Sequence, residues 1–101
     1  MERKEIINNL MSDGALYRCQ GIVFAAMENM TDEKTVSLLR NLKKDRVMKL
    51  GREVGWYAIS ALEMLGVEKY GGDEDLVLRF ISEFPALVLY IKNQVNAQPL
   101  P

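Results

Sequence analysis

Hydrophobic residues recur at spacings of three and four along nearly the whole chain, which is the period of an amphipathic helix. This pattern predicts helices over residues 6–11, 16–30, 36–42, 47–65 and 77–95, and no segment shows a convincing alternation typical of a strand. We therefore expect an all-α protein. Its fold would be a compact bundle of four to six helices in one domain over residues 1–95, followed by a short proline-containing tail over residues 96–101.

Polar residues and glycines between these stretches indicate where the helices begin and end. Ser12 or Asp13 can cap the second helix, and residues 31–33 (Thr-Asp-Glu) supply a cap and a carboxylate for the third. Gly66 follows the fourth helix as a C-terminal stop.

Three residues inside the predicted helices need a specific reason to be there. Gly51 and Gly55 lie one turn apart in the fourth stretch, where each costs about 1 kcal/mol relative to alanine. Either they let another backbone approach closely or they only loosen this helix. Pro85 interrupts the last stretch, which is then one kinked helix or two nearly collinear ones.

The chain contains two loosely matching segments. Residues 10–13 lead into residues 25–31, and residues 42–45 lead into residues 60–66, each with an aspartate in the turn. This arrangement over residues 3–66 resembles the helix pairs of HEAT-type repeats, which carry a turn aspartate and end in an Ala-Leu-x-x-Leu-Gly type of sequence. The family commonly has Val-Arg early in the second helix, a pair that residues 17–18 (Tyr-Arg) approximate and residues 54–55 (Val-Gly) do not. The resemblance implies stacked helical hairpins, an alternative to the compact bundle that is equally all-α.

Composition limits the classes of partner and the cellular location that we expect for this protein. The 101 residues carry a net charge of −1, so no global field attracts nucleic acid or an anionic membrane. Cys19 is the only cysteine, which excludes an internal disulfide, and its apolar neighbours predict a buried position. The charged start, residues 1–5, is unlike a secretory signal, and the longest apolar run, residues 86–91, is too short to span a membrane. We expect a cytoplasmic protein.

The sequence contains few of the residues and motifs that catalytic sites commonly use. The chain has no histidine, which rules out Ser–His and Cys–His nucleophiles, and it has no phosphate-binding loop. Residues 73–75 (Asp-Glu-Asp) are either the acidic first turn of a helix or oxygen ligands for a metal ion. We expect no catalytic residues, no cofactor and no metal, and keep a carboxylate-based enzyme or metal protein as a remote alternative.

The least ordinary feature is a basic segment over residues 40–52. It contains six cations and one acid, Asp45, whereas residues 63–83 are mainly acidic. The segment is either a solvated turn, a docking surface for an acidic protein, or a set of phosphate contacts on nucleic acid. The turn lacks the glycine of a helix-turn-helix motif, which disfavours a DNA reader. The candidate binding residues are Arg40, Lys43, Lys44, Arg46, Lys49, Arg52 and Trp56.

Trp56 and its neighbour Tyr57 cannot share one helix face. Tyr57 fits the buried stripe, so Trp56 either covers a second layer of the core or belongs to an interface. A second candidate interface consists of Leu87, Leu89 and Tyr90, because residues 86–91 are apolar all round. A second copy of the chain would cover them, unless this segment is the central helix of the bundle.

These features favour a non-catalytic interaction module that binds another protein, with an acidic protein as one candidate partner, and that forms a homo-oligomer. The alternative is a small nucleic-acid-binding or regulatory factor that uses the basic segment. No membrane association is expected.

Overall fold

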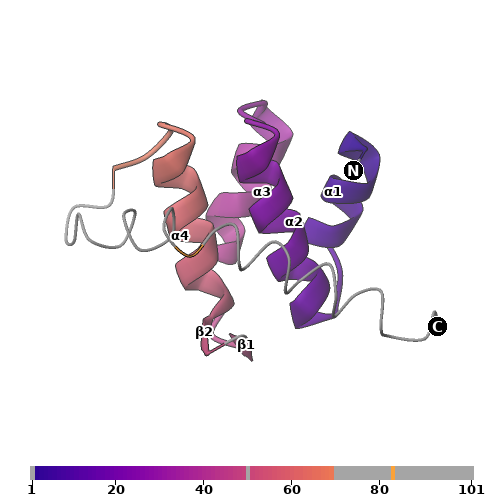
Figure 1. The fold of residues 1–101 in the computed structure, drawn as a ribbon, viewed down its shortest axis with the longest axis vertical. Coiled ribbons are helices and arrows are strands. Elements are labelled where there is room, and N and C mark those ends of the chain that lie inside the picture. The colour runs from indigo at the N-terminus through magenta and orange to yellow at the C-terminus, as the bar shows by residue number, and fades with distance from the viewer. Residues whose placement is uncertain (1, 50, 70–82, 84–101) are drawn as a thin grey trace.

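The computed structural model describes residues 2–49, 51–69 and 83. In chain order these contain α1 (Arg3–Leu10), α2 (Ala15–Met27), α3 (Glu33–Leu42), the two-residue strands β1 (Met48–Lys49) and β2 (Arg52–Glu53), and α4 (Val54–Met64) (Figure 1). The predicted helical class is confirmed, with a small hairpin added to it. Apart from Glu83, the residues of the helix predicted over 77–95 lie outside the described residues, and so do Pro85 and the acidic residues 73–75.

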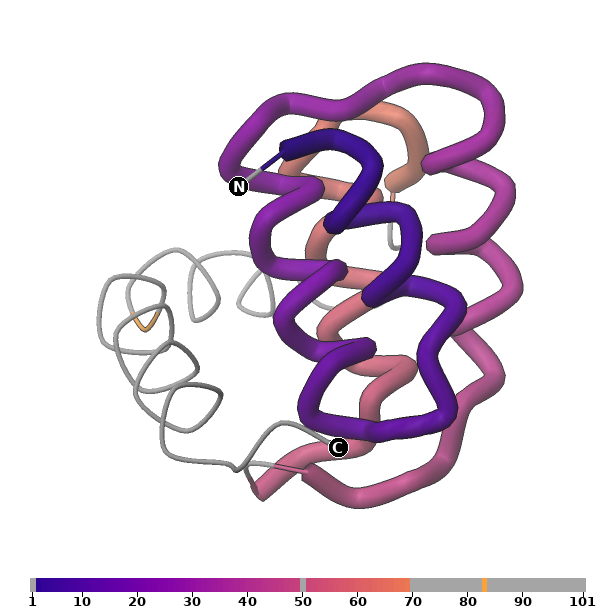
Figure 2. The backbone as a smooth tube through the Cα atoms, turned by 90° about the vertical axis from the view of Figure 1, so that its right-hand side faces the viewer, coloured from indigo at the N-terminus to yellow at the C-terminus, as the bar shows by residue number. Residues whose placement is uncertain are grey.

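The helices form two hairpins that pack side by side. The chain reverses between α1 and α2 and again between α3 and α4, and each helix packs on the one that follows the reversal. In addition α2 packs against α4, whereas α1 and α3 touch only slightly (Figure 2). The second helices of the two hairpins are therefore the inner ones.

The core lies where these helices meet. Residues 19–26 of α2 are all buried, so this helix has no exposed face over two turns. Cys19 is completely buried and Tyr57 is 2% exposed, as their positions in the sequence predict. Burial raises the pKa of the Cys19 thiol to about 11, because an apolar environment disfavours the thiolate.

Two of the predicted helix boundaries are confirmed and one is wrong. Asp32 caps α3: its Oδ2 accepts from the Thr35 amide at 3.1 Å and its Oδ1 from the Thr35 hydroxyl at 2.8 Å. Gly66 follows α4 with a φ of +74°, which suits glycine. Gly14, not Ser12 or Asp13, is the cap residue of α2, because the Ser12 hydroxyl instead accepts from the Gly14 amide at 3.1 Å.

The prediction of a fourth helix beginning near Val47 is also wrong. The chain forms an antiparallel hairpin, with Met48 opposite Glu53, and α4 begins only at Val54. Gly51 has a φ of +81° at the hairpin turn, with open space around it, so it serves the turn and does not allow a close approach. Gly55 does allow one: a Cβ there would lie against the Lys43 carbonyl and 2.9 Å from that of Asp45.

Candidate interaction surface

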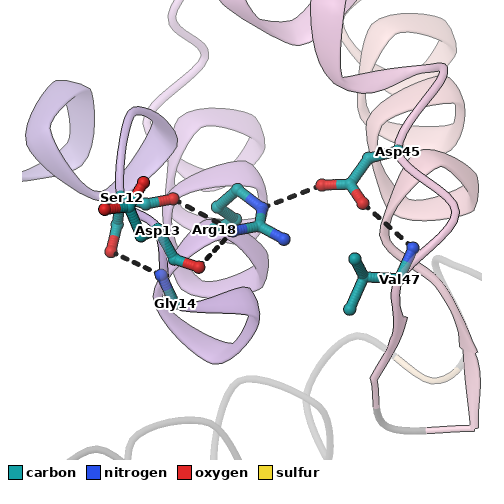
Figure 3. Close-up of polar contacts among 6 residues, drawn as sticks. All are labelled: Ser12, Asp13, Gly14, Arg18, Asp45 and Val47. Atoms are coloured by element: carbon teal, nitrogen blue, oxygen red, sulfur yellow. Dashed lines mark hydrogen bonds and ion pairs between the residues drawn. The ribbon is translucent and has the colours of Figure 1, made fainter.

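The connection between α3 and α4 is held in place by Asp45. The Arg18 Nε donates to the Asp45 Oδ2 at 2.8 Å, and the two side chains are only 13% and 14% exposed. The Arg18 Nη1 also donates to the carbonyls of Ser12 at 3.1 Å and Asp13 at 2.7 Å (Figure 3). One guanidinium therefore joins the α1–α2 turn, α2 and the start of the connection to α4.

The other groups of Asp45 fix the chain that follows it. Its Oδ1 accepts from the Val47 amide at 3.0 Å, and its carbonyl accepts from the Gly55 amide at 2.8 Å. The Val54 amide donates to the Val47 carbonyl at 2.9 Å, which closes the base of the hairpin. The backbone of this connection is thus anchored at both ends by hydrogen bonds.

The side chains on this anchored backbone point to water. Val47 is 48% exposed and Met48 is 62% exposed, beside Lys44 and Arg46, which are also exposed. Lys49 is half-buried. We call Lys44, Arg46, Val47, Met48 and Lys49 the hairpin surface; it combines apolar area with positive charge.

Arg40 and Lys43 come just before this surface in the chain and bind a carboxylate of the same chain. The Arg40 Nε is 2.6 Å from the Glu68 Oε2, and the Lys43 Nζ is 2.8 Å from the Glu68 Oε1. These hydrogen bonds, that of Lys43 first and that of Arg40 second, lower the pKa of the Glu68 carboxyl. We call Arg40 and Lys43 the carboxylate clamp.

Arg52 and Trp56 form a third group next to the hairpin. The Arg52 guanidinium lies 4.3 Å from the centroid of the Trp56 ring, and its Nη2 is 3.3 Å from the Glu83 Oε1. Trp56 is half-buried against the core and meets Tyr57 edge-to-face, with the ring centroids 5.0 Å apart. Trp56 therefore has one side in the core and the other beside Arg52.

The basic and acidic stretches of the sequence thus meet within the chain. Glu68 and Glu83 come from the acidic residues 63–83, and between them they pair with Arg40, Lys43 and Arg52. Within the described residues, Lys44, Arg46 and Lys49 form no ion pair, so these three carry the charge of the hairpin surface.

The sequence indicated Asp45 as a turn aspartate and as the one acid in a basic segment, but its ion pair with Arg18 was not predicted. The signal was present: Arg18 is the only charged residue within α2, and Asp45 is the only acid among residues 40–52. A lone charge in a buried helix requires a partner, and a lone acid among cations is a candidate for one.

The remaining predicted residues give no site in the part described. Leu87, Leu89 and Tyr90 lie outside the described residues. Among the residues that the structure describes, no three His, Cys, Asp or Glu side chains gather closely enough to hold a metal ion. In the same part of the chain, no helix is both long and apolar enough to cross a membrane.

Comparisons with protein-family models, with curated proteins and with solved structures find no match to this chain. The hairpin surface and its surroundings are therefore the features from which a function can be inferred.

Proposed function

We propose that the protein is a non-catalytic interaction module whose hairpin surface binds an acidic segment of another protein. The proposal depends on one observation: exposed apolar side chains and exposed cations occur together on an anchored backbone. The apolar side chains are Val47 and Met48, and the cations are Lys44 and Arg46. An acidic partner with an apolar side chain would complement both properties.

Anchoring matters because ordering a loop on binding costs free energy. The hydrogen bonds of Asp45 and the contact between Val54 and Val47 order this backbone before a partner arrives. Burying the exposed parts of Val47 and Met48 then contributes a favourable term, about 25 cal/mol for each Å² of apolar surface removed from water.

We further propose that the helical hairpins are stacked as HEAT-type units. Two arginines support this arrangement. Arg18 pairs with an acid 27 residues later, and Arg52 pairs with an acid 31 residues later. Each of these arginines lies three positions before a glycine, Gly21 or Gly55, whose missing Cβ admits the backbone at the end of the preceding helix. The same local design thus occurs in both hairpins, as expected when each unit packs on the next.

Nucleic acid is the competing partner, and the exposed apolar side chains argue against it. Contacts to phosphates need cations alone, whereas Val47 and Met48 give the hairpin surface an apolar area that a phosphate backbone does not complement.

The test is fluorescence anisotropy with a fluorescein-labelled peptide of repeating sequence Glu-Glu-Leu. The double variant Lys44→Ser/Arg46→Ser should weaken binding about three- to tenfold, since each exposed pair contributes up to about 1 kcal/mol. Met48→Ser should weaken it further by removing apolar contact.

The matched control is Lys4→Ser/Lys34→Ser, which removes the same charge from exposed positions near the first turns of α1 and α3. Equal losses in the two double variants would mean that the peptide senses net charge alone and would refute the proposal. A labelled DNA duplex serves as the second probe. Binding to the duplex that exceeds peptide binding and falls steeply with salt would favour nucleic acid instead.

A further inference from the structure

Glu68 is bound in the way that a separate acidic ligand would be bound. It belongs to the segment after α4, and each of its two carboxylate oxygens receives one cation from the end of α3. A small hollow of about 30 Å³ adjoins this contact, lined by Ile59, Leu62, Lys69 and the Lys43–Glu68 pair. The contact therefore combines two cations that bind a carboxylate with apolar side chains next to them.

We propose that the carboxylate clamp is part of the partner-binding surface, and that Glu68 occupies it in place of a carboxylate from the acidic partner. This inference rests on the function proposed above. Arg40 and Lys43 are three residues apart, so they lie on the same face at the end of α3, and Lys43 directly precedes Lys44 of the hairpin surface. The clamp and the hairpin surface are consequently continuous along the chain.

The contact is exchangeable because its members are open to solvent. The side chain of Arg40 is 54% exposed, that of Lys43 37% and that of Glu68 28%. Exposed ion pairs of this kind are weak, so a carboxylate from a bound partner can replace Glu68. Glu68 competes with the partner, and its charge lowers the affinity of the surface for acidic segments.

The test compares Glu68→Gln with the wild type in the anisotropy assay with the Glu-Glu-Leu peptide. Releasing both cations should raise the affinity about two- to fivefold. The control, Glu28→Gln, removes the same charge from an exposed position at the end of α2. The gain should also disappear when Glu68→Gln is combined with Arg40→Gln/Lys43→Gln.

Equal gains from Glu68→Gln and Glu28→Gln would overturn the competition, and so would a gain that survives loss of the clamp. These outcomes leave the proposed function intact if Lys44→Ser/Arg46→Ser still weakens binding. Failure of the hairpin variants, with a gain specific to Glu68→Gln, would instead refute the hairpin as the main contact and support the clamp.

A second measurement uses the wild-type protein, so its result does not depend on whether a variant folds. In wild-type protein labelled with ¹³C, carboxyl NMR follows the pKa of Glu68 with and without unlabelled peptide. The pKa is lowered in the free protein. It should rise towards the ordinary glutamate value when the peptide displaces Glu68, and a pKa that stays low at saturating peptide would overturn the inference.

Discussion

Replacing Asp45 should cost more stability than replacing any other charged residue of the basic segment. Asp45→Ala removes the Arg18 ion pair at 2.8 Å, which is largely buried, and the exposed hydrogen bond from the Val47 amide at 3.0 Å. A hydrogen bond to a charged group contributes about 1.5–3 kcal/mol, and Arg18 keeps its two carbonyl partners. We expect a loss of about 2–4 kcal/mol in the free energy of unfolding.

This loss can be measured by urea unfolding followed by circular dichroism. Asp13→Ala is the matched control, because Asp13 lies in the corresponding turn of the first hairpin, its side chain is exposed, and only its carbonyl binds Arg18. It should change stability by less than about 0.5 kcal/mol. A double-mutant cycle with Arg18→Met should give a clear coupling energy to Asp45.

The reasoning would be refuted if Asp45→Ala were as stable as Asp13→Ala, or if the cycle gave no coupling. In that case the connection between α3 and α4 would be held by its backbone bonds alone, and the anchored hairpin would lose its main support.

Three further predictions follow from other parts of the molecule. Gly55→Ala should destabilise the protein by about 1–3 kcal/mol in urea unfolding despite alanine's better helix propensity, because its Cβ would press on two carbonyls; unchanged stability would contradict this close approach. Stability should fall as the pH rises from 9 towards 11, since the Cys19 thiol ionises in the unfolded chain first and only near pH 11 in the folded one, and Cys19→Ala should flatten this part of the pH profile. Sedimentation at micromolar concentration should give more than the 11.5 kDa chain mass, and Leu89→Glu/Tyr90→Glu should return it to that mass; a wild-type monomer would refute the homo-oligomer.

Local pattern was enough to predict most of the helical fold. The spacing of apolar residues, the cap at Asp32 and the stop at Gly66 are all decided within a few residues of sequence. The burial of Cys19 also follows from its position, whereas the sequence could not tell that Gly55 allows a close approach and Gly51 does not.

The hairpin and the ion pairs depend on contacts that no local pattern contains. Val47 has the spacing of a helical stripe, yet Asp45, held by Arg18, binds the Val47 amide and directs the chain into a hairpin. The partners of Arg40, Lys43 and Arg52 are 25 to 31 residues away, so the charge runs were visible in the sequence but their pairing was not.

In the hairpin, the contacts that fix the backbone are different from the side chains that form the exposed surface. Its backbone is fixed by the hydrogen bonds of Asp45 and by the hydrogen bond from the Val54 amide to the Val47 carbonyl. The Tyr57 hydroxyl also donates to the Lys49 carbonyl at 3.4 Å. None of these contacts uses the exposed side chains of Lys44, Arg46 or Met48. Those positions can therefore be exchanged with little cost to folding, so substitutions there change the charge and polarity of the surface while the scaffold that presents the residues stays the same.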